Sequence, residues 1–222
     1  MDLRLRPEHE AFQTEVEAFL AEFWRGQTSR ADISAFRNAA TERGYLYRGI
    51  PKRYGGSEQP ADVIRAEIIR LAFARAGAPR ETPGIGVQLL VPTLLECGAE
   101  WQKEAFIAKT LSGEYRWAQG YSEPGAGSDL ASLRSRAEHQ GEEWVINGHK
   151  IWTTLAHTAT HIFMLVRTEP QAPKREGISY LLLRADQPGV QIRPIKQING
   201  GREFCEMFFE EARTPVDWIV GE

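Results

Sequence analysis

Cysteine is scarce in this chain: its 222 residues include only Cys97 and Cys205. The two lie far apart and lack C-x-x-C spacing, so we expect buried free thiols in a reducing compartment, the cytoplasm, and no disulfide framework. The five histidines form no H-E-x-x-H motif, and none pairs with a cysteine at metal-ligand spacing. His157 and His161 fall on an expected strand, which does not bring them together as a helix would. The sequence therefore predicts no metal site.

Long apolar runs and an excess of basic charge are missing as well. No stretch reaches the roughly 18 apolar residues of a membrane-spanning helix. The first ten residues, M-D-L-R-L-R-P-E-H-E, have no apolar segment and include early acids, so they are neither a secretory nor an obvious organellar signal. A net charge of −3 and a pI near 6.0 argue against nucleic acid as a partner. What remains is a globular chain, 42% apolar, with room for one large domain or two small ones.

The first half of the chain has helical periodicity. Pro7 suits the first position of a helix, and an apolar stripe follows it at Phe12, Val16, Phe19, Leu20 and Phe23. Four more helices are expected: one capped by Thr28 or Ser29 and ended by Gly44, one opened by Pro60, one around residues 87–95 ended by Gly98, and one over residues 100–111. These apolar stripes predict a helical core, and none of their residues requires a catalytic or binding role.

The period changes near Tyr115. Asn147-Gly148 predicts a two-residue hairpin turn, and Gln140-Gly141 predicts the turn before it. Strands are expected over residues 117–121, 133–139, 161–168, 178–183, 190–195 and 204–210. Many short strands at this spacing predict an antiparallel barrel or sandwich. The fold class is therefore α+β, with a helical domain over residues 1–113 and a β-domain over residues 114–222.

Two stretches could carry chemistry: W-A-Q-G-Y-S-E-P-G-A-G-S-D at residues 117–129 and K-I-W-T-T at residues 150–154. The proline and glycines of the first predict a turn whose amides can form a nest, to which Ser122 and Ser128 add hydroxyls. The indole of Trp152 offers a plane for stacking. Alone, such a turn or such a tryptophan is most often structural. Together, in this order, they favour a site for a flat heteroaromatic cofactor.

These stretches resemble the S/T-E-P-x-A-G-S-D and W-x-T signatures of the acyl-CoA dehydrogenase family. I-P-K-R-Y-G-G at residues 50–56, G-A-E-W-Q-K at 98–103 and F-C-E-M-F-F-E-E-A-R-T-P at 204–215 also resemble family motifs. The likeness covers essentially the whole chain. It implies an N-terminal helical domain and a middle β-domain, and we expect the family's C-terminal four-helix bundle to be absent because the chain ends at V-G-E, where that bundle should begin.

The resemblance implies FAD as cofactor. The residues carried over as cofactor-binding are Gln119, Tyr121, Ser122, Gly127, Ser128, Trp152, Thr153 and Thr154. The first three should meet the flavin edge, although family members vary at Gln119. Gly127 and Ser128 should approach the pyrophosphate, with Ser128 also on the substrate side. Trp152 should pack on the ring system, and Thr154 should hydrogen-bond near N5.

The resemblance also implies a reaction, the α,β-dehydrogenation of an acyl-CoA thioester in fatty-acid β-oxidation. A carboxylate base takes the α-proton, the β-hydrogen leaves as hydride to the flavin, and an electron-transferring flavoprotein accepts the electrons. The base belongs to the C-terminal bundle, so no catalytic residue is assigned here, and Glu123 is interpreted as structural. We expect the 222-residue chain alone to bind FAD weakly and dehydrogenate little, and a homo-oligomer or a heteromeric partner to supply the C-terminal helices.

Two other functions stay open. One is a flavin-dependent monooxygenase or a nitroalkane-oxidase-like enzyme on the same scaffold. The other is a non-enzymatic assembly subunit. Ser122, Trp152 and Thr154 argue against it, because an interaction surface has no evident use for all three. S-E-P-G-A-G-S-D-L-A-S-L resembles the type that acts on bulky or dicarboxylic acyl-CoAs.

Overall fold

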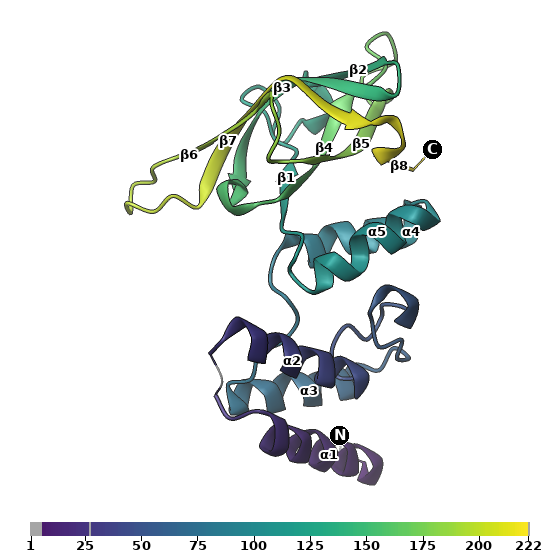
Figure 1. The fold of residues 1–222 in the computed structure, drawn as a ribbon, viewed down its shortest axis with the longest axis vertical. Helices are drawn as coiled ribbons and strands as arrows, with labels where there is room; N and C mark the ends of the chain where they lie inside the picture. The colour runs from purple at the N-terminus through teal and green to yellow at the C-terminus, as the bar shows by residue number, and fades with distance from the viewer. Residues whose placement is uncertain (1–5, 27, 222) are drawn as a thin grey trace. The chain divides into compact units, whose positions relative to one another are not determined.

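The computed structural model describes residues 6–26 and 28–221, so the predictions made on the first five residues and on Glu222 lie outside it. The chain forms two compact units, Met1–Pro83 and Gly84–Glu222, which we call the helical unit and the sheet unit (Figure 1). Among the described residues no helix is long and apolar enough to cross a membrane, and no group of three or more His, Cys, Asp or Glu could hold a metal ion.

The helical unit contains three α-helices, α1 (Pro7–Phe23), α2 (Arg30–Glu42) and α3 (Val63–Ala76), with a short 3₁₀ turn, η1 (Lys52–Tyr54). Pro7 occupies the first turn of α1 as predicted. Ser29 caps α2, because its hydroxyl accepts from the backbone amide of Asp32 at 3.1 Å. Four members of the predicted apolar stripe are buried: Phe12, Val16, Phe19 and Leu20. The ring of Phe19 packs on Phe36 of α2, which in turn packs on Phe73 of α3.

The prediction that Pro60 opens the third helix is wrong. The helix begins at Val63, because the Asp62 carboxylate accepts from the backbone amide of Arg65 at 2.9 Å and so caps it. Pro60 instead belongs to the preceding loop, where its carbonyl accepts from the guanidinium of Arg48 at 3.2 Å.

The sheet unit begins with helices. A π-helical turn, η2 (Gly86–Leu90), leads into α4 (Val91–Cys97), and α5 (Glu100–Leu111) follows as predicted. The π-turn falls where a helix over residues 87–95 was expected. Pro92 has no amide hydrogen to donate back to Gln88, so the regular α-helical ladder cannot run through this point.

The expectation of two buried thiols is half wrong, because Cys205 is buried but Cys97 is exposed at the end of α4.

One sheet of eight strands makes the rest of the unit. They are β1 (Trp117–Gly120), β2 (Arg136–Gln140), β3 (Glu143–Thr154), β4 (His161–Arg167), β5 (Ile178–Arg184), β6 (Val190–Pro194), β7 (Phe204–Pro215) and β8 (Ile219–Val220). Their order is β6-β7-β3-β2-β4-β5-β8, and β1 pairs with β4. Most pairings are antiparallel, whereas β1 runs parallel to β4. An N-terminal helical domain followed by a β-sheet domain is therefore confirmed, and within residues 6–221 no helical bundle follows β8.

The prediction of a turn at Asn147-Gly148 is wrong. β3 continues through both residues, and the hairpin from β2 turns at Gly141, as expected from the second turn signal. Asn147 lies opposite a bulge in β7, where Glu210 and Glu211 stand between the pairs Ile146–Ala212 and Gly148–Phe209, and the Asn147 side chain accepts from the amide of Glu211. A Cβ on Gly148 would lie 2.2 Å from Oγ of Ser135, so close packing explains this glycine. β7 continues to Pro215, beyond the predicted end at residue 210.

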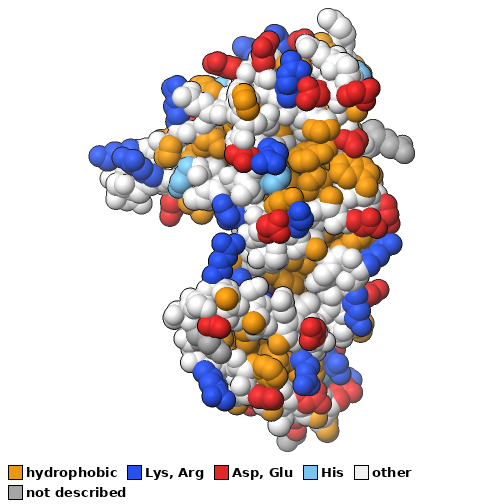
Figure 2. Space-filling view, viewed as in Figure 1, with side chains coloured by type: hydrophobic (Ala, Val, Ile, Leu, Met, Phe, Trp, Pro, Cys, Tyr) orange, Lys and Arg blue, Asp and Glu red, His pale blue; other side chains and the backbone are white. Residues whose placement is uncertain are grey.

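β6 and β7 extend past the other strands as an arm (Figure 1). Figure 2 shows basic side chains gathered at its end, where the loop after β6 exposes Lys196, Ile198 and Arg202. The same end of β3, where Thr154 pairs with Phe204 beside this loop, carries Trp152, Thr153 and Thr154, and there the Thr153 hydroxyl bonds to the carbonyl of Gln119 in β1.

Candidate functional site

The loop after β1 is held in a tight turn. Glu123 and Ala126 exchange two backbone hydrogen bonds, of 2.8 and 3.1 Å, which fold Pro124 and Gly125 outward. At the start of the loop a Cβ on Gly120 would lie 2.8 Å from Cβ of Met164, so only glycine allows β1 to pack this closely. The tight turn and the close approach of β1 to Met164 together fix the direction of the residues that follow.

β3 carries a second irregularity beside this loop. Its pairing with β7 shifts between Lys150 and Thr153, so Ile151 and Trp152 are left out of the ladder. Trp152 has a left-handed backbone with φ of 62°, which is rare for a residue with a side chain. Its indole is 58% exposed and meets the ring of Phe204 edge-on, with centroids 6.2 Å apart. The bulge thus turns a large aromatic face away from the core.

The two segments are joined by hydrogen bonds to carbonyls. From β3, the hydroxyl of Thr153 donates to the carbonyl of Gln119 at 3.2 Å, and the amide of Ile151 donates to the carbonyl of Ser122 at 2.9 Å. Among the described residues, no acceptor binds the backbone N–H of Tyr121 or Ser122. The chain therefore presents two free amide donors close to the exposed indole, which suits a ligand with hydrogen-bond acceptors along one edge.

A buried ion pair lies behind the loop. Nζ of Lys150 donates to Oε1 of Glu123 at 2.8 Å and to the carbonyl of Tyr121 at 3.1 Å, and Lys150 has no exposed surface. The Glu123 carboxylate also accepts from the backbone amides of Arg134 at 2.7 Å and Ser135 at 2.9 Å. Burial opposes ionisation of Glu123, but these donors outweigh it and hold the pKa of the carboxyl below its ordinary value. Burial lowers the pKa of Lys150, and the contact with Glu123 offsets part of that effect.

Two family models match almost the whole chain. The model of the acyl-CoA dehydrogenase N-terminal domain matches residues 6–114, and the model of the middle domain matches residues 118–212. The chain belongs to the acyl-CoA dehydrogenase family. The free amides, the exposed indole and the turn between them thus lie in the part that matches the middle domain.

Known members of the family are similar over long stretches. Acyl-CoA dehydrogenase IpdE1 of Mycobacterium tuberculosis is 44% identical over 187 residues, which are 84% of this chain and 48% of that protein. Among solved structures, the Tcur3481-Tcur3483 steroid ACAD is 34% identical with a TM-score of 0.75, over 100% of this chain and 59% of that one. The ChsE4-ChsE5 complex from Mycobacterium tuberculosis is 30% identical with a TM-score of 0.75, over 100% and 58%. This chain spans about half the length of the curated relatives it matches.

In this acyl-CoA dehydrogenase chain, the residues carried over from the family differ in their burial and in their hydrogen bonds. Gln119, Tyr121, Ser122 and Thr153 are brought together by the bonds described above. Thr153 is buried and its hydroxyl binds protein, whereas Thr154 is exposed.

The remaining carried-over residues are Gly127 and Ser128. Both are exposed, and the hydroxyl of Ser128 makes no hydrogen bond to the other described residues of the set. A Cβ on Gly127 would meet nothing within 4 Å, so open space lies beside this part of the loop.

Lys150 is the functional candidate that sequence reasoning missed. It is the first residue of K-I-W-T-T, but no family role was carried over to it. The signal was available: a lysine that faces the core side of a strand among apolar residues requires a buried partner. Glu123, the one acidic residue inside the turn, supplies it.

Aromatic side chains support the inner face of the loop. The ring of Tyr121 meets those of Phe163 and Tyr180 edge-on, with centroids 6.0 and 6.4 Å away, and Phe163 stacks on Tyr180 at 5.6 Å. Burial and the neighbouring Tyr121 raise the pKa of the Tyr180 hydroxyl, which therefore stays protonated. This cluster fixes the side chain of Tyr121, whose amide has no acceptor among the described residues.

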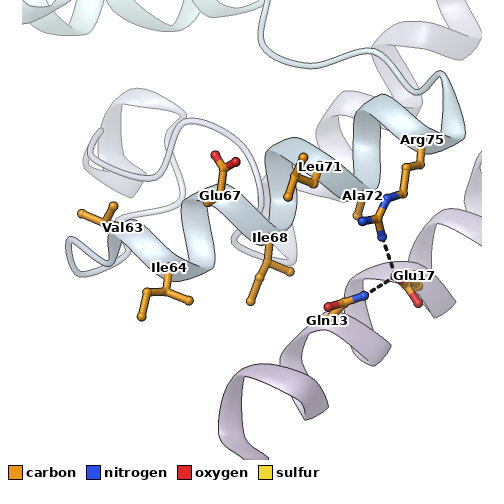
Figure 3. Close-up of a pocket in the computed structure, with 9 residues that line it drawn as sticks. All are labelled: Gln13, Glu17, Val63, Ile64, Glu67, Ile68, Leu71, Ala72 and Arg75. Carbon is orange, nitrogen blue, oxygen red and sulfur yellow. Dashed lines mark hydrogen bonds and ion pairs between the residues drawn. The ribbon is translucent and has the colours of Figure 1, made fainter. Parts of the chain in front are cut away.

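The helical unit of this family member has a groove of its own, of about 440 Å³, between α1 and α3 (Figure 3). Val63, Ile64 and Leu71 line it and are partly or fully exposed. Its rim is polar, with Gln13 and Arg75 both directed at Glu17. An exposed aliphatic groove with paired charges at its rim has the character of a contact surface and offers no group for catalysis.

Proposed function

We propose that this chain is the N-terminal helical and middle β part of an FAD-dependent acyl-CoA dehydrogenase, an oxidoreductase that introduces an α,β double bond into an acyl-CoA. The observation that carries the proposal is the pair of free amides at Tyr121 and Ser122 beside the outward indole of Trp152. A flavin needs donors along its pyrimidine edge and an apolar surface against its rings, and the described residues supply both.

The chain's own residues fit this cofactor in distinct ways. Tyr121 and Ser122 donate from the backbone to the ring edge, where donors stabilise the charge that develops on reduction. Trp152 packs on the ring system. Thr154, the next exposed residue of β3, donates near N5. When bound, FAD supplies the acceptor for the hydride.

Gly127 and Ser128 complete the proposed site on the other side of the turn. Gly127 leaves room for a backbone approach, and the Ser128 hydroxyl donates to the pyrophosphate or to the substrate. The open space beside Gly127 supports this assignment, because a bulky neighbour would block a diphosphate.

The base for the α-proton comes from helices beyond these 222 residues, on this chain or on a partner. Glu123 is the buried acid of the signature, and its carboxylate is engaged by Lys150 and two backbone amides. A carboxylate held ionised by three donors is a weak proton acceptor. These contacts agree with the structural role predicted for Glu123.

The proposed substrate is a bulky acyl-CoA of the steroid class, and the proposed electron acceptor is an electron-transferring flavoprotein. The similarity to a solved steroid ACAD supports the former, together with the S-E-P-G-A-G-S-D-L-A-S-L sequence. Two of the similar structures are named as pairs of proteins, Tcur3481-Tcur3483 and ChsE4-ChsE5, which supports a heteromeric partner here. That the 222 residues alone bind FAD weakly and turn over little substrate stays a prediction.

The test is anaerobic reduction of the protein purified from its source with any partner retained. Addition of a steroid-derived acyl-CoA should bleach the flavin absorption, and an electron-transferring flavoprotein should restore it. A straight-chain acyl-CoA should bleach it more slowly. Reoxidation by oxygen with an oxygenated product would indicate a monooxygenase instead, and a purified protein without flavin absorption would contradict the proposal.

A further inference from the structure

The buried pair of Lys150 and Glu123 connects the two halves of the proposed flavin site. Glu123 directly follows Ser122 in the turn, and Lys150 lies two residues before Trp152 on β3. The ion pair of 2.8 Å is therefore the shortest side-chain link between the segment that offers amides and the segment that offers the indole.

The second contact of Lys150 fixes the orientation of one peptide group. Its Nζ donates to the carbonyl of Tyr121 at 3.1 Å from the interior of the sheet unit. In a trans peptide the carbonyl of one residue and the N–H of the next point in opposite directions, and no peptide among the described residues is cis. Holding the Tyr121 carbonyl inward therefore turns the N–H of Ser122 outward, where no described residue accepts it.

The stem of Lys150 passes beside Gly120 on its way to this carbonyl. Cγ of Lys150 lies 3.5 Å from where a Cβ on Gly120 would be, so the lysine passes across the face of β1. A polar group of this length is required here, because the carbonyl of Tyr121 and the carboxylate of Glu123 both need a donor from the interior. A purely apolar side chain would leave the carbonyl of Tyr121 unpaired and the Glu123 carboxylate with two backbone amides but no balancing charge.

Stability alone does not explain why the pair is present. Replacing a buried ion pair by apolar residues of similar volume is often neutral or stabilising, so such a pair is a poor device for holding a fold together. A pair that fixes the direction of a functional amide is a better explanation.

We propose that Lys150 is a positioning residue, which acts with Glu123 to aim the Ser122 N–H at the edge of the flavin and to hold the turn in register with Trp152. The inference rests on the proposed function for its ligand. Lys150 itself touches no ligand in this account and transfers no proton.

The test compares four forms of the full chain: wild type, Lys150→Met, the double variant Lys150→Met/Glu123→Gln, and Thr110→Val as a control. The double variant removes both charges and so avoids an unpaired buried carboxylate. Thr110→Val destabilises the sheet unit by removing the hydrogen-bond acceptor of Trp117, and it leaves every contact of Lys150 and Glu123 in place. All four are studied at a temperature at which circular dichroism shows them folded.

The first readout needs no cofactor. Hydrogen exchange should speed up in both Lys150 variants at the amides of Ile151, Arg134 and Ser135. Their acceptors are the carbonyl of Ser122 and the carboxylate of Glu123, which the Lys150–Glu123 pair holds in place. Exchange at these amides should not change in Thr110→Val. Unchanged exchange at these amides in Lys150→Met/Glu123→Gln would overturn the proposal, whatever the protein binds.

The second readout is FAD titration followed by flavin fluorescence. Loss of one aimed donor should raise Kd about tenfold in both Lys150 variants, with no change in Thr110→Val. The flavin that still binds should have a lower reduction potential in the Lys150 variants, an effect that loss of stability alone does not produce. Wild-type affinity and potential in the double variant would overturn the positioning role. If the wild type binds no FAD and exchange is still faster in the Lys150 variants, the result would support the ordering of the turn by Lys150 and Glu123 and contradict the proposed function.

Discussion

The indole N–H of Trp117 in β1 donates to the hydroxyl of Thr110 in α5 at 2.9 Å, and both side chains are buried. This bond joins a helix to the sheet across the boundary predicted after residue 113. Phe106 of α5 packs on Trp117 and on Trp218, so this helix shares a core with the strands. The division into residues 1–113 and 114–222 stays a prediction about the family's organisation, whereas the packing unit begins at Gly84.

Thr110→Val should destabilise the sheet unit. Valine keeps the shape of threonine but leaves the buried Nε1 of Trp117 without an acceptor, at a cost of about 1–3 kcal/mol. Thr110→Ser keeps the hydroxyl and should cost less. Urea unfolding followed by tryptophan fluorescence measures the difference, and equal midpoints for the two variants would show that the bond contributes nothing.

Gly148→Ala should destabilise the same unit by about 1–3 kcal/mol, because its new methyl group would overlap the side chain of Ser135. Gly125→Ala is the matched control, since a Cβ there meets nothing within 4 Å. Adding Ser135→Gly to Gly148→Ala should recover part of the loss. If both alanine variants unfold at the same denaturant concentration, close packing does not explain the glycine at position 148.

Most of the fold was predictable from the sequence, because apolar periodicity and short-range caps determine it. Helix α5, the cap at Ser29 and the turn at Gly141 follow from local signals of this kind. Asn147-Gly148 misled because the residue types of a hairpin turn also suit a strand opposite a bulge, and only the position of Ser135 and β7 distinguishes the two. Lys150 was missed for a similar reason: its partner is 27 residues away in sequence.

Trp152→Gly should be more stable than Trp152→Ala, the reverse of the usual order in a strand. Both variants lose the indole and its contact with Phe204, but only glycine accepts a φ of 62° without strain. Left-handed strain at a residue with a side chain costs about 1–3 kcal/mol. Chemical unfolding of the two variants isolates this strain, and a more stable alanine variant would show that the bulge is relaxed.

The sheet unit should lose stability in mild acid because of His161. Burial, with a smaller effect of the nearby Arg184, lowers the pKa of His161 from 6.5 to about 4. The unfolded chain therefore takes up a proton at this residue before the folded one does. The stabilisation is complete above pH 6.5, falls as the pH drops below it, and is lost near pH 4.

This effect amounts to at most about 3 kcal/mol, from the difference between the two pKa values. His161→Phe should keep the aromatic contacts with Tyr115 and Trp117 and remove this part of the pH dependence. Urea unfolding at several pH values between 4 and 7 measures it. Parallel pH profiles for the two proteins would mean that the pKa of His161 is the same in the folded and the unfolded chain.

The central claim is that the turn after β1 and the bulge in β3 together bind a flavin. The most direct measurement is FAD titration of the chain, followed by quenching of flavin fluorescence, for wild type, Trp152→Ala and the control Trp101→Ala, which removes another partly exposed tryptophan. We expect saturable quenching by wild type and Trp101→Ala, and binding about tenfold weaker for Trp152→Ala. No saturable quenching by wild type, or equal binding by all three, would contradict the account.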